Sequence, residues 1–429
     1  MSEAELNFEV ARLGTCRIPS PMGSIQFVED DEHVLYHTSL KEIKACECAG
    51  REPPGFEIAG PRREIFFDPS KLKCGVVTCG GLCPGLNDVI RSIVLSLHHH
   101  YGVQTVFGFQ YGFEGLTYRY GHRPLELSPE TVRDIHMKGG TILGSSRGPQ
   151  DVLEMVDTLD RMNIGILFTI GGDGTLKGAL AISEEIAKRN LKIAVVGIPK
   201  TIDNDISYMD RSFGFTTAVS EARTSIYAAS TEALGARNGI GLVKLMGRES
   251  GFIAAYATLA TSEVNFCLVP EVRFTLEGFM ETLRERILKR RHAVIVVAEG
   301  AGQELMAETS GTDASGNVRF GDIGTFLRDK IKEYFGKAGM ELNLKYIDPS
   351  YTIRSKSATT QDSVFCLLLG HNAVHAAMSG RTGMVVGFWN EEFTHVPIRL
   401  AVSKRKRIDP NGKLWDYVLA ATGQPRNMV

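Results

Sequence analysis

The chain has 429 residues, of which 43% are hydrophobic and 23% charged, as in an ordinary globular protein with room for two or three core-bearing lobes. Lysine and arginine number 48, and aspartate and glutamate 50, so a net charge of −2 gives no general attraction to nucleic acid or to an anionic membrane. No apolar run approaches the ~20 residues of a membrane span, and eight cysteines without paired C-x-x-C spacing or a signal peptide indicate a reducing, cytoplasmic compartment.

Residues 1–72 differ in pattern from the rest of the chain. They carry scattered proline and glycine and few long periodic runs. Short strands are predicted at Phe27–Val28 and at His33–Tyr36. We interpret this segment as an N-terminal extension that wraps the core or contacts another subunit.

From residue 73 onward, short runs rich in valine and isoleucine alternate with amphipathic helical stretches. Strands are predicted at Cys74–Thr78, Ile164–Ile170, Ile193–Ile198, Ile240–Met246, Ala293–Ala298 and Gly383–Phe388. Helices are predicted at Asn87–Tyr101, Thr175–Arg189, Glu249–Thr261, Leu276–Arg291 and Thr360–Met378. Continuous apolar strands between helices indicate parallel sheets covered on both faces. The pattern therefore predicts an α/β fold of doubly wound, Rossmann-like lobes, with ligands at the carboxyl ends of the strands.

Two glycine-rich loops have the small residues that suit phosphate binding. The loop Cys79–Asn87 precedes a helix, whose N-terminus offers N–H groups and about half a positive charge. The loop Gly139–Gly148 carries Arg147, whose planar guanidinium fits a phosphate. Taken alone, a tight packing turn explains the first loop equally well, and a surface ion pair explains Arg147 equally well.

The loop Gly171–Thr175 places Asp173 between glycines at the end of a predicted strand. A carboxylate there can hold Mg²⁺, which proteins usually bind through one or two carboxylates plus substrate phosphates. The alternative is that Asp173 only caps the helix Thr175–Arg189. The motif points to nucleotide kinases of at least three kinds and does not fix the acceptor.

The loop Pro199–Asp205 collects Lys200, Thr201, Asp203 and Asp205 at one strand end. A hydroxyl nucleophile needs a base within ~3 Å, and phosphoryl transfer needs charge neutralised around the transferring group. One aspartate can be the base, and the other can orient Mg²⁺ or a neighbouring arginine. A surface Asx turn would not account for the lysine and threonine beside them.

The loop Met246–Gly251 also joins a predicted strand to a helix. Gly247 permits a close turn there, and Arg248 projects at the helix start, where it suits an anionic ligand. A basic run, Lys404–Arg407, lies near the end of the chain. We interpret the run as a solvated strand end or a phosphate-facing patch in preference to a nuclear signal.

The motifs in this order resemble those of the phosphofructokinase family. They are GGLCPGLN (80–87), LGSSRG (143–148), GGDGT (171–175), PKTIDND (199–205), MGR (246–248), AEG (298–300) and IDPSYTIR (347–354). The resemblance covers roughly residues 73–405, and NAD kinases share only GGDGT. The chain most resembles the long-chain group related to pyrophosphate-dependent enzymes, in particular the ATP-using branch, which also has an N-terminal extension.

The resemblance implies an ATP- and Mg²⁺-dependent 6-phosphofructokinase of glycolysis, a homodimer or homotetramer that phosphorylates the 1-hydroxyl of fructose 6-phosphate. The alternatives are a pyrophosphate-dependent enzyme and a non-catalytic regulatory subunit of the same fold. Domains are expected at 1–72 (extension), at 73–215 with 355–405 (donor lobe), and at 216–354 with 406–429 (fructose 6-phosphate lobe).

The family's functional residues carry over onto matching positions. Asp203 would be the general base, Arg248 and Thr201 would assist catalysis, and Asp173 would bind the metal. Contacts to the phosphoryl donor are expected from Gly81, Arg147, Gly148, Gly172, Asp173, Gly174, Thr175 and Lys200. Contacts to fructose 6-phosphate are expected from Thr201, Ile202, Asp203, Met246, Gly247, Arg248, Glu299, Tyr351, Thr352, Ile353 and Arg354.

Three positions depart from parts of the family. Pyrophosphate users usually carry aspartate at position 174, so Gly174 leaves open the path of the ATP α-phosphate and favours ATP. Bacterial ATP enzymes usually have glycine at position 200, whereas Lys200 is typical of pyrophosphate enzymes and suits either donor. Short-chain enzymes supply an arginine to a neighbouring subunit from a position that is Gly239 here, with Arg237 two residues earlier, which puts that contact in doubt.

Overall fold

The structure is a computed structural model that describes residues 7–23, 25–306, 311 and 319–429. The chain divides into two compact units. The first consists of Met1–Thr201, Ile206–Gly214 and Lys356–Lys404, and the second of Ile202–Asp205, Phe215–Ser355 and Arg405–Val429. Among the described residues, no helix is long and apolar enough to cross a bilayer.

The first unit is built on a nine-stranded sheet of order β3-β4-β17-β16-β10-β9-β6-β7-β8. Its strands are β3 (His33–Leu35), β4 (Gly55–Ile58), β6 (Lys73–Thr78), β7 (Thr105–Phe109), β8 (Leu125–Glu126), β9 (Ile166–Gly171), β10 (Ala194–Pro199), β16 (Met384–Trp389) and β17 (Glu392–Pro397). The central strands from β16 to β7 pair in parallel, and the outer strands are antiparallel. Every residue of β9 and β10 is buried, which explains their continuous apolar sequences.

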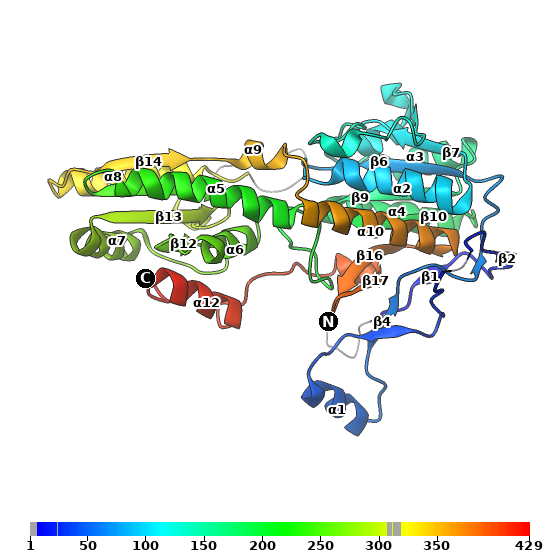
Figure 1. Ribbon diagram of the computed structural model, residues 1–429, viewed down its shortest axis with the longest axis horizontal. Coiled ribbons are helices and arrows are strands. Elements are labelled where there is room, and N and C mark those ends of the chain that lie inside the picture. The colour runs from blue at the N-terminus through cyan, green and yellow to red at the C-terminus, as the bar shows by residue number, and fades with distance from the viewer. Residues whose placement is uncertain (1–6, 24, 307–310, 312–318) are drawn as a thin grey trace. The chain divides into compact units, whose positions relative to one another are not determined.

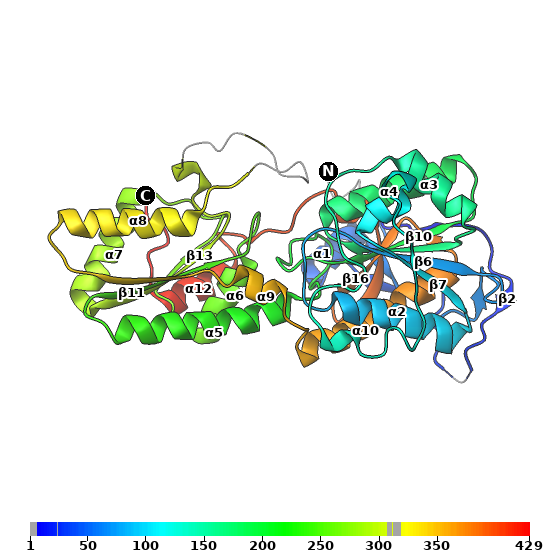
Figure 2. The same cartoon turned by 90° about the horizontal axis from the view of Figure 1, so that it is seen from above.

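Helices cover both faces of this sheet (Figures 1 and 2). On one face lie α2 (Leu86–Tyr101) and α10 (Thr360–Met378), and on the other α3 (Val152–Arg161), α4 (Asp173–Lys188) and the short α11 (Ile398–Ala401). Helices α2 and α10 pack closely because Gly370 of α10 has no side chain. A Cβ atom at this position would lie 2.4 Å from the hydroxyl oxygen of Ser92 on α2. That hydroxyl donates to the carbonyl of Leu367 at 2.6 Å. The remaining short elements are α1 (Leu40–Cys48), η2 (Gly112–Leu116), η3 (Tyr118–Tyr120) and η4 (Ile135–Met137).

The N-terminal extension packs on the first unit through short strands and buried charges. β1 (Ala11–Arg12) pairs with β15 (Arg381–Thr382), and β2 (Ile18–Pro19) pairs with β5 (Glu64–Ile65). The buried guanidinium of Arg381 donates to both carboxylate oxygens of Glu57 at 2.7 Å. The strand predicted at Phe27–Val28 is wrong. Val28 donates one hydrogen bond to the carbonyl of Pro61 at 3.0 Å, and a proline has no N–H with which to continue a ladder.

The second unit contains a four-stranded parallel sheet of order β12-β13-β11-β14. Its strands are β11 (Gly239–Leu245), β12 (Phe266–Leu268), β13 (His292–Ala298) and β14 (Asn343–Ile347). Side chains of α7 (Leu276–Arg290) and α8 (Ile323–Lys337) form a core against one face, while α5 (Phe215–Leu234), flanked by α6 (Phe252–Thr261), covers the other (Figure 2). The short η5 (Gln303–Leu305), α9 (Ser350–Arg354) and α12 (Lys413–Thr422) complete the unit. The α/β fold expected from the sequence is confirmed.

Gly239 brings β11 into direct contact with the backbone of α5. A Cβ atom at this position would lie 2.0 Å from the carbonyl oxygen of Ala233. No side chain fits at position 239, because the backbone of Ala233 occupies the space. The arginine that the resemblance to short-chain enzymes led us to look for at this position is therefore absent. Arg237 lies exposed in the turn before the strand.

Candidate active site

Hydrogen bonds join the loop after β6 to the loop between η4 and α3 in the first unit. The amide of Gly80 donates to the carbonyl of Ser146 at 3.0 Å, and the hydroxyl of Ser145 donates to the carbonyl of Gly80 at 2.6 Å. The side chain of Asn87, at the start of α2, accepts from the amide of Ile142 at 2.9 Å. The two glycine-rich loops predicted as separate phosphate-binding elements therefore form one surface, with Arg147 exposed beside them.

The GGDGT loop begins α4 in a way that the sequence left open. The N-cap residue is Gly172, and Asp173 is the first helical residue, so the interpretation of Asp173 as the N-cap is wrong. The carboxylate of Asp173 pairs with Lys177 at 2.9 Å and stays partly exposed. Gly174 is exposed as well, and a Cβ atom built there would have no atom within 4 Å. The carboxylate of Asp173 thus lies at the start of α4, beside Lys177.

Lys200 lies at the end of β10, between the two loops just described. Its amide donates to the carbonyl of Gly171 at 2.9 Å, and its Nζ atom donates to the carbonyl of Gly81 at 2.7 Å. Because β6, β9 and β10 are neighbours in the sheet, their carboxyl ends bring Gly81, Gly172 and Lys200 together. This edge is where parallel sheets place ligands.

The segment after Lys200 passes from one unit to the other. Lys200 and Thr201 belong to the first unit, Ile202–Asp205 to the second, and Ile206–Gly214 again to the first. Since each residue extends the chain by at most ~3.5 Å, Asp203 stays covalently within about 11 Å of Lys200. The aspartates of the PKTIDND motif are therefore tied to the lysine whichever way the units are arranged.

Asp203 is surrounded by charged residues of the second unit. Burial raises the pKa of this carboxyl to about 7, with a further increase from the negative charges of Asp205 and Glu299. The positive charge of Arg354 and a backbone hydrogen bond from Arg248 act in the opposite direction. The groups that act on the carboxyl of Asp203 therefore come from PKTIDND, MGR, AEG and YTIR, motifs that are far apart in sequence.

The MGR loop is shaped by a glycine that no other residue could replace without strain. Gly247 has φ +125°, and a Cβ atom there would lie 2.6 Å from the carbonyl oxygen of Ser250. The amide of Gly300, from the AEG motif, donates to the carbonyl of Gly247 at 3.0 Å. The guanidinium of Arg248 lies 4.3 Å from the ring centre of Phe320, a contact that sequence reasoning missed.

The helix predicted from Glu249 begins instead at Phe252. The amide of Gly251 donates to both carboxylate oxygens of Glu271 at 3.0 and 3.1 Å, which holds residues before Phe252 in a non-helical loop. Sequence reasoning also missed Glu271, since nothing in its local pattern marks it. The loop therefore presents Arg248 from a bend, not from a helical turn.

The YTIR motif forms the short helix α9, with Arg354 as its last residue. The Nε atom of Arg354 is buried and has no hydrogen-bond partner among the residues that the structure describes. Tyr351 is 86% exposed, and Thr352 is exposed as well, whereas Ile353 is fully buried. Ile353, Ile202 and Met246 are packed into the core, so they could meet a ligand only through backbone atoms.

The predicted residues thus fall into two groups, one in each unit. The first unit holds Gly81, Arg147, Gly148, Gly172, Asp173, Gly174, Thr175, Lys200 and Thr201. The second unit holds Ile202, Asp203, Met246, Gly247, Arg248, Glu299, Tyr351, Thr352, Ile353 and Arg354. Among the described residues, no three histidine, cysteine, aspartate or glutamate side chains form a ready-made metal cage.

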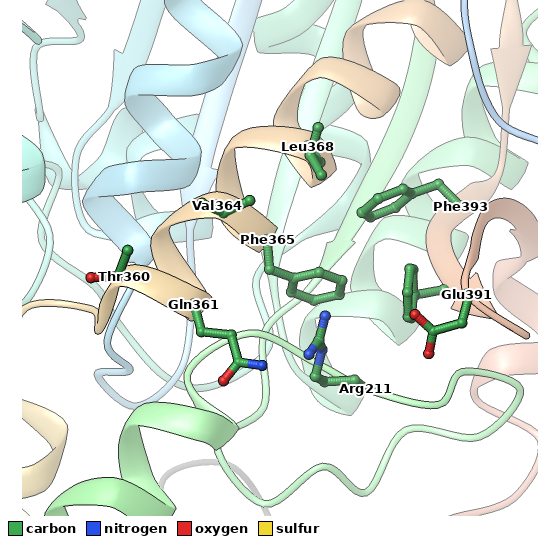
Figure 3. A pocket seen from close by; sticks show the side chains of 9 residues that line it. Arg211, Thr360, Gln361, Val364, Phe365, Leu368, Glu391 and Phe393 are labelled. Carbon is green, nitrogen blue, oxygen red and sulfur yellow. The ribbon is translucent and has the colours of Figure 1, made fainter.

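A surface pocket of about 580 Å³ on the first unit contains none of these residues (Figure 3). The guanidinium of Arg211 points toward Phe365, 4.4 Å from its ring centre, between Glu391 and the first turns of α10. Lining residues are Arg211, Thr360, Gln361, Val364, Phe365, Leu368, Phe388, Glu391 and Phe393. The chemistry expected from the motifs therefore lies elsewhere on the chain.

Each unit has a parallel sheet with glycine-containing loops at the carboxyl ends of its strands, and the second unit also has a buried carboxyl near Arg354, features that are typical of enzymes acting on phosphorylated substrates. The chain belongs to the phosphofructokinase family, whose model, described as phosphofructokinase, matches residues 73–377.

Three relatives that align with nearly the whole chain are all named ATP-dependent 6-phosphofructokinase. The chain is 48% identical to an ATP-dependent 6-phosphofructokinase of Borreliella burgdorferi, over 99% of this chain and 98% of the relative. It is 48% identical to the enzyme of that name from Amycolatopsis methanolica, over 98% and 95%. With the enzyme of that name from Trypanosoma brucei brucei, it shares 44% identity over 98% and 88%.

Solved structures support the fold. A pyrophosphate-dependent phosphofructokinase from Marinobacter aquaeolei matches with a TM-score of 0.68 at 18% identity, over 82% of this chain and 92% of that one. The phosphofructokinase of Pichia pastoris in the T-state matches with a TM-score of 0.64 at 21% identity, over 82% and 37%. At such identities the match shows the fold alone, so these structures do not decide the donor.

Proposed function

We propose that the protein is an ATP-dependent 6-phosphofructokinase that converts fructose 6-phosphate to fructose 1,6-bisphosphate in glycolysis. The observation that carries this proposal is the site around Asp203, where a buried carboxyl lies within the electrostatic reach of Arg354 and the Arg248 amide. A base and anion-binding arginines are what a phosphorylated sugar alcohol requires. The near-full-length relatives named ATP-dependent 6-phosphofructokinase support the same substrate pair.

Asp203 accepts the proton of the 1-hydroxyl as that oxygen attacks the γ-phosphorus of ATP, while the bond from this phosphorus to the bridging oxygen breaks and ADP leaves. A base with a pKa near the working pH is efficient because it is largely ionised and still binds the proton well. The pKa of about 7 for Asp203 meets this condition. Thr201, two residues earlier, and the backbone of Ile202 would orient the sugar beside it.

Arg354 binds the 6-phosphate and Arg248 neutralises charge on the transferring group. The buried Nε atom of Arg354, without a partner among the described residues, fits an arginine built to meet an anion. Glu299, Tyr351, Thr352 and the backbones of Met246, Gly247 and Ile353 would complete the contacts to fructose 6-phosphate.

The donor is bound by the loops of the first unit, through Gly81, Arg147, Gly148, Gly172, Gly174, Thr175 and Lys200. Open space around Gly174 leaves room for the α-phosphate and the rest of a nucleotide, which favours ATP. Lys200, buried against the carbonyl of Gly81, offers positive charge to the terminal phosphates of either donor. The openness at position 174 is the reason for preferring ATP to pyrophosphate.

Asp173 would hold Mg²⁺, whose charge offsets that of the donor's phosphates. The partly exposed carboxylate at the start of α4 fits this role, because Mg²⁺ usually keeps water and phosphate oxygens in its shell. Asp173 therefore orients the donor through the cation, while Lys177 holds the carboxylate in place.

In this proposal the protein forms a homodimer or homotetramer and acts in the cytoplasm. None of the eight cysteines, all of which lie in the described residues, forms a disulfide, as suits a reducing compartment. A non-catalytic regulatory subunit is disfavoured because Asp173, Asp203 and Arg248 are all present.

The test is an assay of purified protein with fructose 6-phosphate, Mg²⁺ and either ATP or pyrophosphate. We expect turnover with ATP, dependence on Mg²⁺, and little turnover with pyrophosphate. Activity with pyrophosphate alone would refute ATP as the donor, and inactivity with both would favour the regulatory subunit.

A further inference from the structure

The basic run near the end of the chain has a specific use in the second unit. Arg405 lies against Asp205, with Nη1 2.5 Å from a carboxylate oxygen, and the amide of Lys406 donates to the carbonyl of Asp205 at 2.9 Å. Both the side chain and the backbone of Asp205 are therefore held by consecutive residues of this segment. The basic run is thus not a solvated strand end, because two of its residues bond Asp205.

The next residues of the segment hold the MGR loop. Arg407 donates to the carboxylate of Glu249 at 2.7 Å. The amide of Ile408 donates to Glu271 at 2.9 Å, and Glu271 also accepts from the amide of Gly251. The ammonium of Lys406 lies 5.2 Å from the ring centre of Phe252, the first residue of α6.

Residues 405–408, which we call the C-terminal strap, therefore touch both loops that surround Asp203. We propose that the strap holds these two loops in one geometry, and that Arg405 is a positioning residue for Asp205 and, through it, for the general base. This inference rests on the proposed function, since it assigns Asp203 the role of the base. Nothing in the local sequence of the strap identifies Asp205 as its partner.

Burial makes the contact to Asp205 matter more than an ordinary surface ion pair. The side chain of Asp205 is 8% exposed and that of Arg405 34%. A buried carboxylate that loses its cation is strongly destabilised where it lies and tends to move, whereas exposed pairs contribute little. Asp205 lies two residues from Asp203, so a shift of its backbone moves the base.

The chain offers a matched control in Arg399. Its guanidinium pairs with Glu184 at 2.7 Å, but the two side chains are 75% and 52% exposed and lie on α11 and α4 of the first unit. Arg399→Gln removes the same chemical group as Arg405→Gln without touching either acceptor loop. A loss of kcat in Arg405→Gln that exceeds the loss in Arg399→Gln is therefore due to the strap.

The test compares steady-state kinetics and thermal unfolding of the wild type, Arg399→Gln, Arg405→Gln and Arg405→Lys. We expect Arg405→Gln to lower kcat by about 10- to 100-fold, as small displacements of a catalytic group do, while KM for ATP changes by less than about threefold. Arg405→Lys should recover part of the loss because it keeps the charge. A kcat of Arg405→Gln within about twofold of that of Arg399→Gln would overturn the proposal.

A double-mutant cycle with Asp205→Asn separates positioning from a general structural effect. If Arg405 acts through Asp205, the double variant loses about as much kcat as the worse single variant. If the loss of kcat in the double variant equals the product of the losses in the two single variants, the proposal is overturned. If Arg405→Gln does not fold, the same cycle with Arg405→Lys decides in its place. An inactive wild type refutes the proposed function, whereas an active wild type with unaffected Arg405 variants refutes the strap alone.

Discussion

Lys200 donates a hydrogen bond from its Nζ atom to the carbonyl oxygen of Gly81, 2.7 Å away, and its side chain is buried. The bond joins the end of β10 to the loop after β6, although β9 lies between these strands in the sheet. A mobile surface lysine would leave the glycine-rich loop to adopt several conformations. The buried lysine instead fixes both its own charge and the glycine-rich loop after β6.

Replacing Lys200 with methionine should therefore weaken donor binding selectively. We expect KM for ATP to rise by roughly tenfold or more, the size of a lost charged hydrogen bond, with little change in KM for fructose 6-phosphate. Steady-state kinetics with each substrate varied in turn would measure this. Lys188→Met, at an exposed position near the end of α4, is the control. An equal rise in both KM values would contradict a donor-side role.

The elevated pKa of Asp203 predicts the pH dependence of activity. The base must be ionised to accept a proton, so kcat/KM should fall about tenfold per pH unit below the pKa of about 7 and level off above it. A pH profile of kcat/KM for fructose 6-phosphate would show this limb. A profile that stays flat down to pH 5 would exclude Asp203 as the titrating base.

The same carboxyl should make the protein less stable as the pH rises. Its folded-state pKa of about 7 lies above the ordinary value of 3.8, so the folded state binds the proton more tightly than the unfolded state. The free energy of unfolding therefore decreases between pH ~4 and ~7 on account of this group. Asp203→Asn should unfold at a higher temperature than the wild type at pH 8, and at a similar temperature at pH 4. A lower melting temperature at pH 8 would contradict the pKa.

Removing the carboxyl should abolish most of the catalysis without removing the sugar phosphate. We expect Asp203→Ser to lower kcat by at least ~10²-fold, the usual loss of a general base, while fructose 6-phosphate still binds. Calorimetric titration with fructose 6-phosphate would confirm that binding persists. Wild-type turnover in this variant would remove Asp203 from the mechanism.

Gly174 offers a test of donor choice. A side chain at this position meets no protein atom within 4 Å, so Gly174→Asp should fold normally. In the proposed mode of donor binding the added negative charge would lie beside the ATP α-phosphate, so kcat/KM for ATP should fall more than any activity with pyrophosphate. Melting temperature and both activities are measured together. Equal effects on the two donors would refute the argument.

The two halves of the candidate site differed in how far the sequence could predict them. Strands β9 and β10 and helices α2, α4 and α10 were visible as apolar runs and amphipathic stretches, and their ends agree with the structure to within about two residues. The loops directly after them could be located for the same reason. Such local patterns predict the structure of nearby residues along the chain, but not contacts between distant segments.

Contacts between distant segments could not be predicted in this way. Arg405 is 200 residues from Asp205, and Glu271 reaches both Gly251 and Ile408. The start of α6 was misplaced because Glu271 binds the loop before it, and no residue near Glu249 signals that bond. The strand at Phe27–Val28 failed because its partner segment contains Pro61, a fact that lies outside any local window.

Because the chain passes back and forth between the two units, it limits how recombination could exchange either unit. The first unit is completed only by Lys356–Lys404, and the second receives Ile202–Asp205 from between two pieces of the first. A single exchange of gene segments anywhere between residues 201 and 404 would therefore give a first unit of mixed parentage. Neither unit can be inherited, duplicated or replaced as one continuous stretch. Recombination that replaced one unit whole would therefore need several breakpoints in the gene.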